Sequence, residues 1–349
     1  MKKPSFLSAA VTMLVAFAAS LGDKLHAALF GYMADRGMVL GALTLVEAAK
    51  INSGDVVRAA VIEMFARESD LLMALPFENI AGNAYHYSLE AKLPGVGFRG
   101  VNEGFSESTG ILNPVTEALA IAGGDLDVDR FIVNTQGQAV RSRHEAMKVK
   151  ALAAAITAKL IKGDSSTDPR EFDGWQRRLG TGSQVVSAGS TAGGAALSLA
   201  ALDEAIDAVD GPTHLVMSKA MRRKFTSAAR DTAVAGFVTY TKDAFGRPVT
   251  MYNDLPILVA YNNNGGDEIL PFTEASASGA ATSTSIYVAS LGEGKVTGLQ
   301  NGTMDVRDLG ELQAAPVYRT RVEWYVTQAV MHGRALARIR NIGNLAIVK

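Results

Sequence analysis

The alternation of hydrophobic and polar positions divides the chain into helical and extended segments. A capping box at residues 44–47 predicts a short helix, because Thr44 and Glu47 satisfy each other's free backbone donors. Asp55 opens a second helical segment, residues 55–69, whose apolar side chains recur at helical spacing. Both helices are expected to pack on a core. The longest helical pattern covers residues 139–162.

Residues 84–92 and 116–133 show the alternation of strands, and a long loop separates them. The loop is rich in Gly, Ser, Asn and Glu. Connections of this length without structure of their own are usually functional or disordered. The pattern predicts a β-hairpin that projects from the body, with glycines that serve tight turns and close backbone approach.

A mixed α and β unit follows a Gly- and Ala-rich boundary at residues 187–198. Ser198 and Ser218 each precede a helical pattern, so both are predicted to cap helices. Residues 318–339 alternate as a long half-buried strand that ends in a turn. The other strands predicted in this half are residues 213–218, 248–253, 256–262, 283–291 and 295–299.

The predicted loop contains a G-x-G-x-x-G pattern formed by Gly95, Gly97 and Gly100. This pattern indicates dinucleotide binding only where a buried strand precedes it and a helix begins at its last glycine. Here a partly charged, alternating stretch ending in Pro94 precedes it, and no helical period follows. Both tests fail, so the glycines need another explanation and no cofactor is expected.

Composition places few limits on the protein. Hydrophobic residues make up 48% of the 349 residues and charged residues 20%, which is typical of one large or two ordinary globular domains. The net charge of −1 gives no global basic field that would indicate nucleic acid as the main partner. The absence of cysteine excludes disulfides, thiolate metal sites and cysteine nucleophiles.

The first twenty residues have the pattern of a secretory signal peptide, with two lysines, an apolar run and a small-x-small site at Ala16 and Ala18. The apolar run is too short and too interrupted to predict a membrane span. Two other interpretations stay open: an arm that packs on neighbouring subunits, or a start codon set too far upstream.

Three carboxylates, Asp125, Asp127 and Asp129, are spaced by two and so share one face of a strand. A calcium-binding EF-hand loop would need Gly at Arg130 and Glu at Gln136, so that motif is absent. Like charges on one strand face repel unless cations lie opposite. We expect salt links within or between subunits, ahead of adventitious cation binding or catalysis.

The helical run 139–162 carries six basic residues and one acidic residue, Glu145. A solvated charged face is the simpler interpretation. The alternative is a helix that faces a polyanion and makes phosphate contacts independent of sequence.

The sequence shows no recognisable catalytic constellation. The five histidines are scattered, and neither a nucleophile elbow nor a Walker loop is present. Trp175 and Trp324 are expected to be core or interface anchors. We therefore predict that the protein is not an enzyme and that it holds no metal.

The order of these features, together with several stretches, closely resembles the major capsid proteins of tailed bacteriophages with the Hong Kong 97-like shell fold. The stretches are LPFENIAGNAYHYSLEAKLPGVGFRGVNEGFSESTG, GGDLDVDRFIV, TLVEAAKI and VYRTRVEWYVTQAVMHGRALARI. The resemblance covers roughly residues 42–349 and implies an α+β fold with an N-terminal arm, an extended E-loop, a long spine helix and an axial domain. Residues 1–41 match nothing in the family.

The resemblance implies a division of the chain into named parts. These are an N-terminal extension (1–41), N-arm helices (42–82), the E-loop hairpin (83–122), a peripheral domain (123–189) with the spine helix at 139–162, an axial domain (190–312) and a return strand to the peripheral domain (313–349).

The same resemblance implies roles for particular residues. In the E-loop, assembly residues are Lys92, Gly95, Gly97, Arg99, Gly100, Glu103 and Gly104. Intersubunit salt-link candidates are Asp125, Asp127 and Asp129, and candidates that face packaged DNA are Arg141, Arg143, Lys148 and Lys150. Some family members crosslink subunits through Lys–Asn isopeptide bonds, but no motif assigns a partner to Lys92, so no crosslink is predicted.

These features predict a structural subunit of an icosahedral phage head. It would form hexamers and pentamers around double-stranded DNA, with portal and scaffold proteins as further partners and no membrane contact. Assembly would take place in the host cytoplasm, and the product would be a virion. The alternative with the same fold is an encapsulin-like compartment shell. The alternative from another class is an exported binding protein with a signal peptide.

Overall fold

The computed structural model describes residues 69–348, except residues 181, 231–237, 243–247 and 278. By its internal contacts the chain divides into two units, Met1–Gly41 and Ala42–Lys349. The first unit and the helices predicted from 44–47 and 55–69 lie outside the described residues, apart from Ser69. None of the described helices is long and apolar enough to span a membrane.

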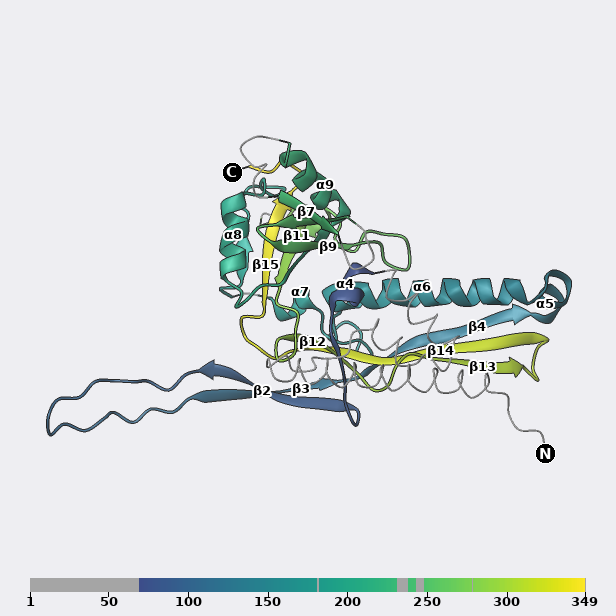
Figure 1. Ribbon diagram of the computed structural model, residues 1–349, viewed down its shortest axis with the longest axis horizontal. Coiled ribbons are helices and arrows are strands. Elements are labelled where there is room, and N and C mark those ends of the chain that lie inside the picture. Colours follow the sequence, from purple (N-terminus) through teal and green to yellow (C-terminus); the bar gives the residue numbers. More distant parts are fainter. Residues whose placement is uncertain (1–68, 181, 231–237, 243–247, 278, 349) are drawn as a thin grey trace, which may run out of the picture. The chain divides into compact units, whose positions relative to one another are not determined.

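One large sheet packs against the longest helix. Its elements are β1 (Phe77–Asn79), β4 (Ala120–Asp129), β12 (Val296–Gln300), β13 (Asp305–Glu311), β14 (Val317–Val330) and the helix α6 (Gln138–Lys162). Strand β14 pairs with β4 along one edge and with β13 and β12 along the other. Helix α6 runs alongside β4 and β14 (Figure 1).

The alternation predicted for β14 is confirmed and explains how the sheet binds α6. Val322, Trp324 and Val326 are almost completely buried on one face of the strand, in the same apolar cluster as Leu152 and Ile156 of α6. Burying side chains of this size removes them from water at a gain of about 1.5–3 kcal/mol each. The helix and the sheet therefore stabilise each other along the length of β14.

The segment 116–133 is not one continuous strand, as the alternation predicted. The structure separates β3 (Ile111–Ala118) from β4 at Leu119, and a short helix, α5 (Arg130–Gln136), follows β4 directly. The Asp129 carboxylate accepts a hydrogen bond of 2.7 Å from the Phe131 amide. Because this side chain caps a free helical donor, RFIV continues as a helix despite its β-favouring residues.

The second large sheet has eight strands among the described residues and carries two helices. Its strands are β5 (Val185–Ser187), β6 (His214–Ser218), β7 (Val238–Lys242), β8 (Pro248–Tyr252), β9 (Leu255–Ala260), β10 (Glu274–Ala275), β11 (Ala281–Ala289) and β15 (Leu336–Gly343). The order is β5-β15-β11-β6-β9-β8-β7, with β10 added on β11.

The two helices of this sheet confirm the predicted caps. Ser198 caps α8 (Leu199–Asp207), and Ser218 caps α9 (Lys219–Ala228) by accepting from the Met221 amide at 3.2 Å. Helix α8 packs on β5 and β15, and α9 packs on β6 and β9. The apolar sides of both helices share one buried cluster with the sheet.

The strands of the two sheets do not divide at the predicted boundary between residues 312 and 313. Strands β12 and β13, placed in the axial domain 190–312, pair with β14 in the first sheet. Strand β15, placed in the return segment 313–349, lies between β5 and β11 in the second sheet. The correction concerns long-range strand pairing, which the local pattern of a strand does not specify.

The half-buried histidine of the second sheet predicts an acid-sensitive stability. Burial lowers the pKa of His214, the first residue of β6, to about 4. In the unfolded chain the pKa of His214 returns to about 6.5. Between about pH 6.5 and pH 4 the unfolded chain therefore binds a proton at His214 that the folded chain does not bind, so the unfolding free energy decreases as pH falls through this range. We expect His214 to remove about 2 kcal/mol of unfolding free energy between pH 7 and pH 5, measured by urea denaturation.

The variant His214→Gln isolates this contribution. It keeps a polar side chain at the start of β6 but has no proton to bind in this range. Its unfolding free energy is expected to change less between pH 7 and pH 5 than that of the parent. Equal pH dependence in the two proteins would contradict the prediction.

Candidate functional site: the projecting hairpin

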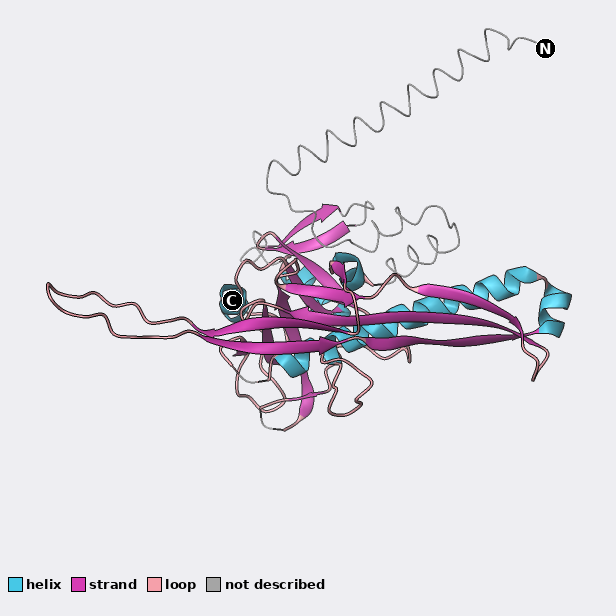
Figure 2. Ribbon diagram, turned by 90° about the horizontal axis from the view of Figure 1, so that it is seen from below, coloured by secondary structure: helices cyan, strands magenta, loops and turns pink. Residues whose placement is uncertain are grey.

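The predicted hairpin is formed by β2 (Ala84–Lys92) and β3, which pair antiparallel as a two-stranded sheet. Figures 1 and 2 show the loop of residues 93–110 continuing beyond the paired strands. The register places His86 opposite Thr116, and their side chains hydrogen-bond at 2.8 Å. A register shift between Glu90 and Lys92 interrupts the pairing near its outer end.

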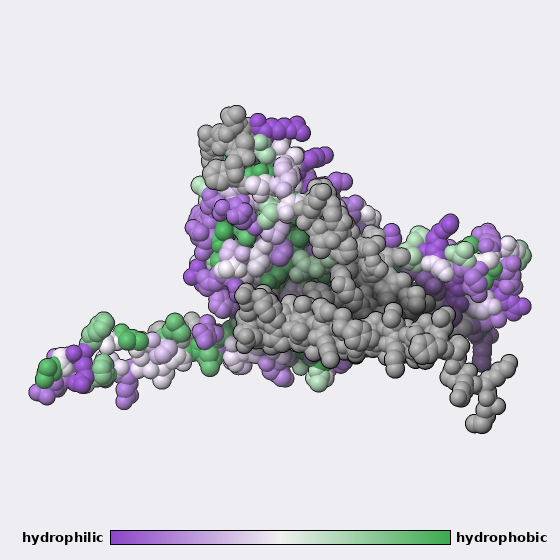
Figure 3. Space-filling model, in the orientation of Figure 1, coloured by the Kyte–Doolittle hydropathy of each residue, from purple (hydrophilic) through white to green (hydrophobic). Residues whose placement is uncertain are grey.

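The outer part of the hairpin exposes large apolar side chains. Val96 is 95% exposed and Phe98 106% exposed, so neither packs on the chain that carries it. Apolar colour along the hairpin is visible in the space-filling view (Figure 3). The side chains that share this exposure are Leu93, Val96, Phe98, Val101, Phe105, Ile111 and Leu112. A contiguous run of this kind marks an interaction surface, because isolated soluble proteins rarely expose one.

The tip has a small local structure that does not bury these side chains. The Gly100 amide donates to the Glu103 carboxylate at 2.8 Å, and the Arg99 guanidinium donates to the Glu103 carbonyl at 3.1 Å. Arg99 also lies over the Phe105 ring, 5.2 Å from its centroid. The turn at 101–102 leads into extended chain and not into a helix. The arrangement required of a dinucleotide loop is therefore not present at Gly100.

Two of the tip glycines have no reason within the chain to be glycine. A Cβ atom built on Gly97 or Gly104 would meet nothing within 4 Å, and neither residue has a positive φ. Gly95 faces only Ser108, whose hydroxyl donates to the Gly95 carbonyl at 2.8 Å. Lys92 pairs through its backbone with Ile111.

The base of the hairpin is tied to the body by a largely buried ion pair, whose side chains are 16% and 12% exposed. Arg178, at the end of α7 (Trp175–Arg178), donates to both carboxylate oxygens of Glu117 on β3, at 2.6 and 2.8 Å. The Tyr87 hydroxyl donates to the same carboxylate at 3.1 Å. Burial, reinforced by the Glu117 charge, raises the pKa of Tyr87 to about 12. A two-point charged contact fixes orientation as well as position.

The same arginine connects the hairpin to β14. Its guanidinium also donates to the carbonyls of Asp173 and Gln328, at 3.0 and 3.2 Å. The Gln328 amide in turn donates to the Leu160 carbonyl of α6 at 2.9 Å. Burial disfavours the charged form of Arg178, but the bond to Glu117 outweighs it, so the pKa is raised. Sequence reasoning did not find this network, because no spacing links residues from such distant segments.

The carboxylates of β4 share one strand face, and two of them have partners within the chain. Arg321 donates to both oxygens of Asp125, at 2.7 and 2.9 Å. Arg319 does the same to Asp127, at 2.7 and 2.6 Å. These hydrogen bonds lower the pKa of both carboxyls. Asp129 caps α5, so the intramolecular form of the predicted salt links accounts for this cluster, and an intersubunit role stays a prediction.

The charge of Arg141 on the basic helix α6 is neutralised within the chain, which corrects one prediction. Arg141 is only 8% exposed, and its guanidinium pairs with Asp308 and Glu145 and donates to Thr320. It cannot face packaged DNA, because its charge is buried and is paired with the carboxylates of Asp308 and Glu145. Lys159 pairs with Glu171.

The remaining candidates on this helix differ in exposure. Arg143 and Lys150 are exposed, whereas Lys148 is half-buried against Gly124 and lies near Asp125. Within the described residues, no group of three or more His, Cys, Asp or Glu side chains is arranged to hold a metal ion.

Comparison with known proteins places this fold. Residues 52–200 match the family "Major capsid protein GP7". No curated protein sequence matches the chain. The holo-SrpI encapsulin complex from Synechococcus elongatus PCC 7942 superposes with a TM-score of 0.57 at 18% identity, covering 80% of this chain and 89% of that chain.

Two further structures come from particles named as capsid or phage. The capsid of the native GTA particle has a TM-score of 0.56 at 16% identity, covering 79% of this chain and 91% of that one. The structure from Mycobacterium phage Bobi has a TM-score of 0.54 at 15% identity, with coverage of 78% and 89%.

These comparisons confirm the resemblance to the major capsid proteins of tailed phages and the Hong Kong 97-like shell fold. The described fold is thus that of capsid and encapsulin shell proteins, and residues 52–200 match a family of major capsid proteins.

The ion pair at the base of the hairpin predicts a large loss of stability when one partner is removed. Glu117→Gln leaves the Arg178 charge buried without its counterion, which costs about 3 kcal/mol of unfolding free energy. Urea denaturation of the unassembled protein measures it. The matched control is Glu311→Gln, which breaks the Arg130 pair at 3.0 Å, where the side chains are 53% and 38% exposed. Exposed pairs contribute less than about 1 kcal/mol, so equal losses in the two variants would contradict the prediction.

Proposed function

We propose that the subunit assembles through its hairpin, whose tip lies on an adjacent copy and buries its apolar side chains there. The observation that carries this proposal is the near-complete exposure of Val96 and Phe98 on a hairpin whose base is fixed. A fixed base aims the tip, and an apolar tip gains free energy only when another surface covers it.

The expected gain per contact is sufficient for a shell. Each large apolar side chain that leaves water contributes about 1.5–3 kcal/mol. In a closed shell every subunit makes and receives such a contact, so modest affinities multiply once neighbours are held in place. We propose an icosahedral shell built from hexamers and pentamers, in keeping with the capsid family that the chain matches.

The tip glycines support a close approach between subunits. Gly97 and Gly104 have open space around them within their own chain and ordinary backbone angles. Absence of a side chain there lets the backbone of a neighbour come within van der Waals distance. Arg99 and Glu103 hold the shape of the turn. Lys92, Gly95 and Gly100 are proposed as further positions that lie near the adjacent copy.

The content and partners of the shell follow from the capsid assignment. We propose that the shell encloses double-stranded DNA, is completed by portal and scaffold proteins, assembles in the host cytoplasm and performs no catalysis. An encapsulin-like compartment has the same fold, as the SrpI structure illustrates. The match to a major capsid protein family favours DNA as the content. Nuclease-protected DNA in shells purified with the portal and packaging genes tests this, and shells that contain only protein cargo would favour the compartment.

The apolar tip predicts an assembly defect without a folding defect. The double variant Val96→Ser/Phe98→Ser removes the two most exposed apolar side chains of the loop, so it is expected to abolish closed shells in electron micrographs and light scattering. The matched control, Leu309→Ser/Leu345→Ser, changes side chains that are 44% and 54% exposed elsewhere and is expected to assemble. Shells of normal yield from the tip variant would overturn the hairpin proposal.

The tip glycines predict a second set of variants in which assembly is lost while folding stability is kept. Gly97→Val and Gly104→Val add side chains that meet nothing in the same chain. The unfolding free energy is therefore expected to change by no more than about 0.5 kcal/mol, as for other surface substitutions. Shell formation is expected to fail, because the added methyl groups occupy the space of the neighbour. Assembly at parental yield would show that no neighbour approaches these positions.

A further inference from the structure

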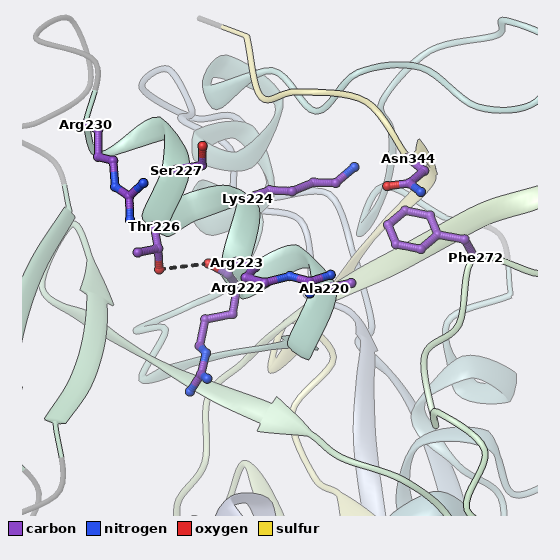
Figure 4. Close-up of a pocket in the computed structure, with 9 residues that line it drawn as sticks. All are labelled: Ala220, Arg222, Arg223, Lys224, Thr226, Ser227, Arg230, Phe272 and Asn344. Carbon is purple, nitrogen blue, oxygen red and sulfur yellow. Dashed lines mark hydrogen bonds between the residues drawn. The ribbon is translucent and has the colours of Figure 1, made fainter.

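Helix α9 carries a cluster of positively charged side chains and contains no acidic residue. Its sequence is KAMRRKFTSA, and Arg230 follows it by two positions. A surface concavity of about 630 Å³ lies beside it (Figure 4). The residues of the helix and its end that line this concavity are Ala220, Arg222, Arg223, Lys224, Thr226, Ser227 and Arg230. Phe272 and Asn344 complete the lining from other segments.

The charges of this cluster are not neutralised by the part of the chain that the structure describes. Arg222, Arg223 and Arg230 form no ion pair with any described residue. This differs from α6, where the Arg141 and Lys159 charges are matched by carboxylates. Among the described residues, α9 and its C-terminal end therefore carry three arginines without an ion pair, although the longest basic run in the sequence is elsewhere.

Helix α9 cannot rotate about its axis, so its arginines stay on the solvent side. Met221 and Phe225 are buried in the core beneath α9, which fixes the rotation of the helix. Arg222 lies within the helix, and Arg230 lies two residues beyond its last residue, Ala228. Lys224 is directed away from them, as Figure 4 shows, and donates to the Leu345 carbonyl at 2.7 Å.

Neutral donors lie among the charged ones. Ser227 lies between Arg222 and Arg230 on the chain, and the Asn344 side chain lines the same concavity, whereas the Thr226 hydroxyl donates to the Arg222 carbonyl at 3.1 Å. Arginine together with hydroxyl and amide groups is the set that contacts phosphate oxygens along a nucleic-acid backbone. The lining contains no carboxylate that would repel a phosphate. Such a set binds phosphates irrespective of base sequence.

We infer that the α9 surface, formed by Arg222, Arg223, Ser227 and Arg230, binds the phosphate backbone of nucleic acid. This inference rests on the proposed function, because the ligand would be the DNA that the shell encloses. It places the contact with DNA on α9 and not on residues 141–150 of α6. A separate surface from the hairpin is involved, so binding and assembly can be measured independently.

Fluorescence anisotropy with a labelled duplex of random sequence tests the inference at several salt concentrations. The variant Arg222→Gln/Arg223→Gln/Arg230→Gln is expected to bind at least about tenfold more weakly at low salt and to reduce the salt slope by about 2 to 3, since each lost phosphate contact reduces it by about 0.9. The charge-conserving variant with Lys at the three positions is expected to keep most of the binding. The matched control, Arg143→Gln/Lys150→Gln on α6, is expected to bind like the parent.

Several outcomes would overturn the inference. They are parental affinity in the triple Gln variant, an equal loss in the α6 control, and displacement of the duplex by polyglutamate at a lower charge concentration than by unlabelled DNA. If the triple variant does not fold by circular dichroism, the exposed single changes Arg223→Gln and Arg230→Gln replace it, each expected to reduce the slope by about 0.9.

Light scattering on the same samples keeps the two proposals apart. Loss of shells with unchanged DNA binding would make α9 a contact between copies and overturn the inference. DNA binding that depends on the three arginines, in a protein that forms no shells, would support the inference and contradict the assembly proposal.

Discussion

The structure depends on the burial of one face of β14. This strand pairs on both edges, and its apolar face holds α6 through Val322, Trp324 and Val326. Phe77 of β1 adds a ring contact to Trp324 at 5.2 Å between centroids. Gly123 on β4 is required by the same strand, since a Cβ there would collide with the Val322 carbonyl. Without this burial neither the long helix nor the far end of the sheet would have a partner.

The hairpin obtains its direction from that framework, and we propose that its apolar tip packs on another copy of the chain. Gln328 of β14 links the carbonyl of Leu160 to the guanidinium of Arg178, which holds Glu117 on the hairpin. The strands are thus fixed where they leave the body, whereas Val96 and Phe98 at the tip touch nothing of their own chain. A rigid base with an unsatisfied apolar tip is the physical requirement for reaching over a neighbour, and it suits a shell subunit that is stable before assembly.

Many charged side chains of the described residues form ion pairs within the chain. Asp125 and Asp127 are each held by an arginine of β14, and Arg141 is buried between carboxylates. Exposed pairs of this kind contribute little stability, but they prevent repulsion between like charges on one strand face. The near-neutral total of −1 therefore conceals local differences, because the arginines of α9 have no ion pair among the described residues whereas Arg141 does.

By itself the sequence determined the elements whose signals are local. The alternation of β14, the caps at Ser198 and Ser218, and the hairpin with its glycine-rich loop were all predicted, because each depends on residues within a few positions of one another. Only the tertiary structure decided that β12 and β13 join β14 while β15 joins the second sheet. It also decided that Arg141 is buried whereas Arg222 and Arg230 have no counterion among the described residues. The physical reason is the same in each case: periodicity is set by neighbours along the chain, whereas the partner of a strand edge or of a charge is set by which distant segments the fold brings together.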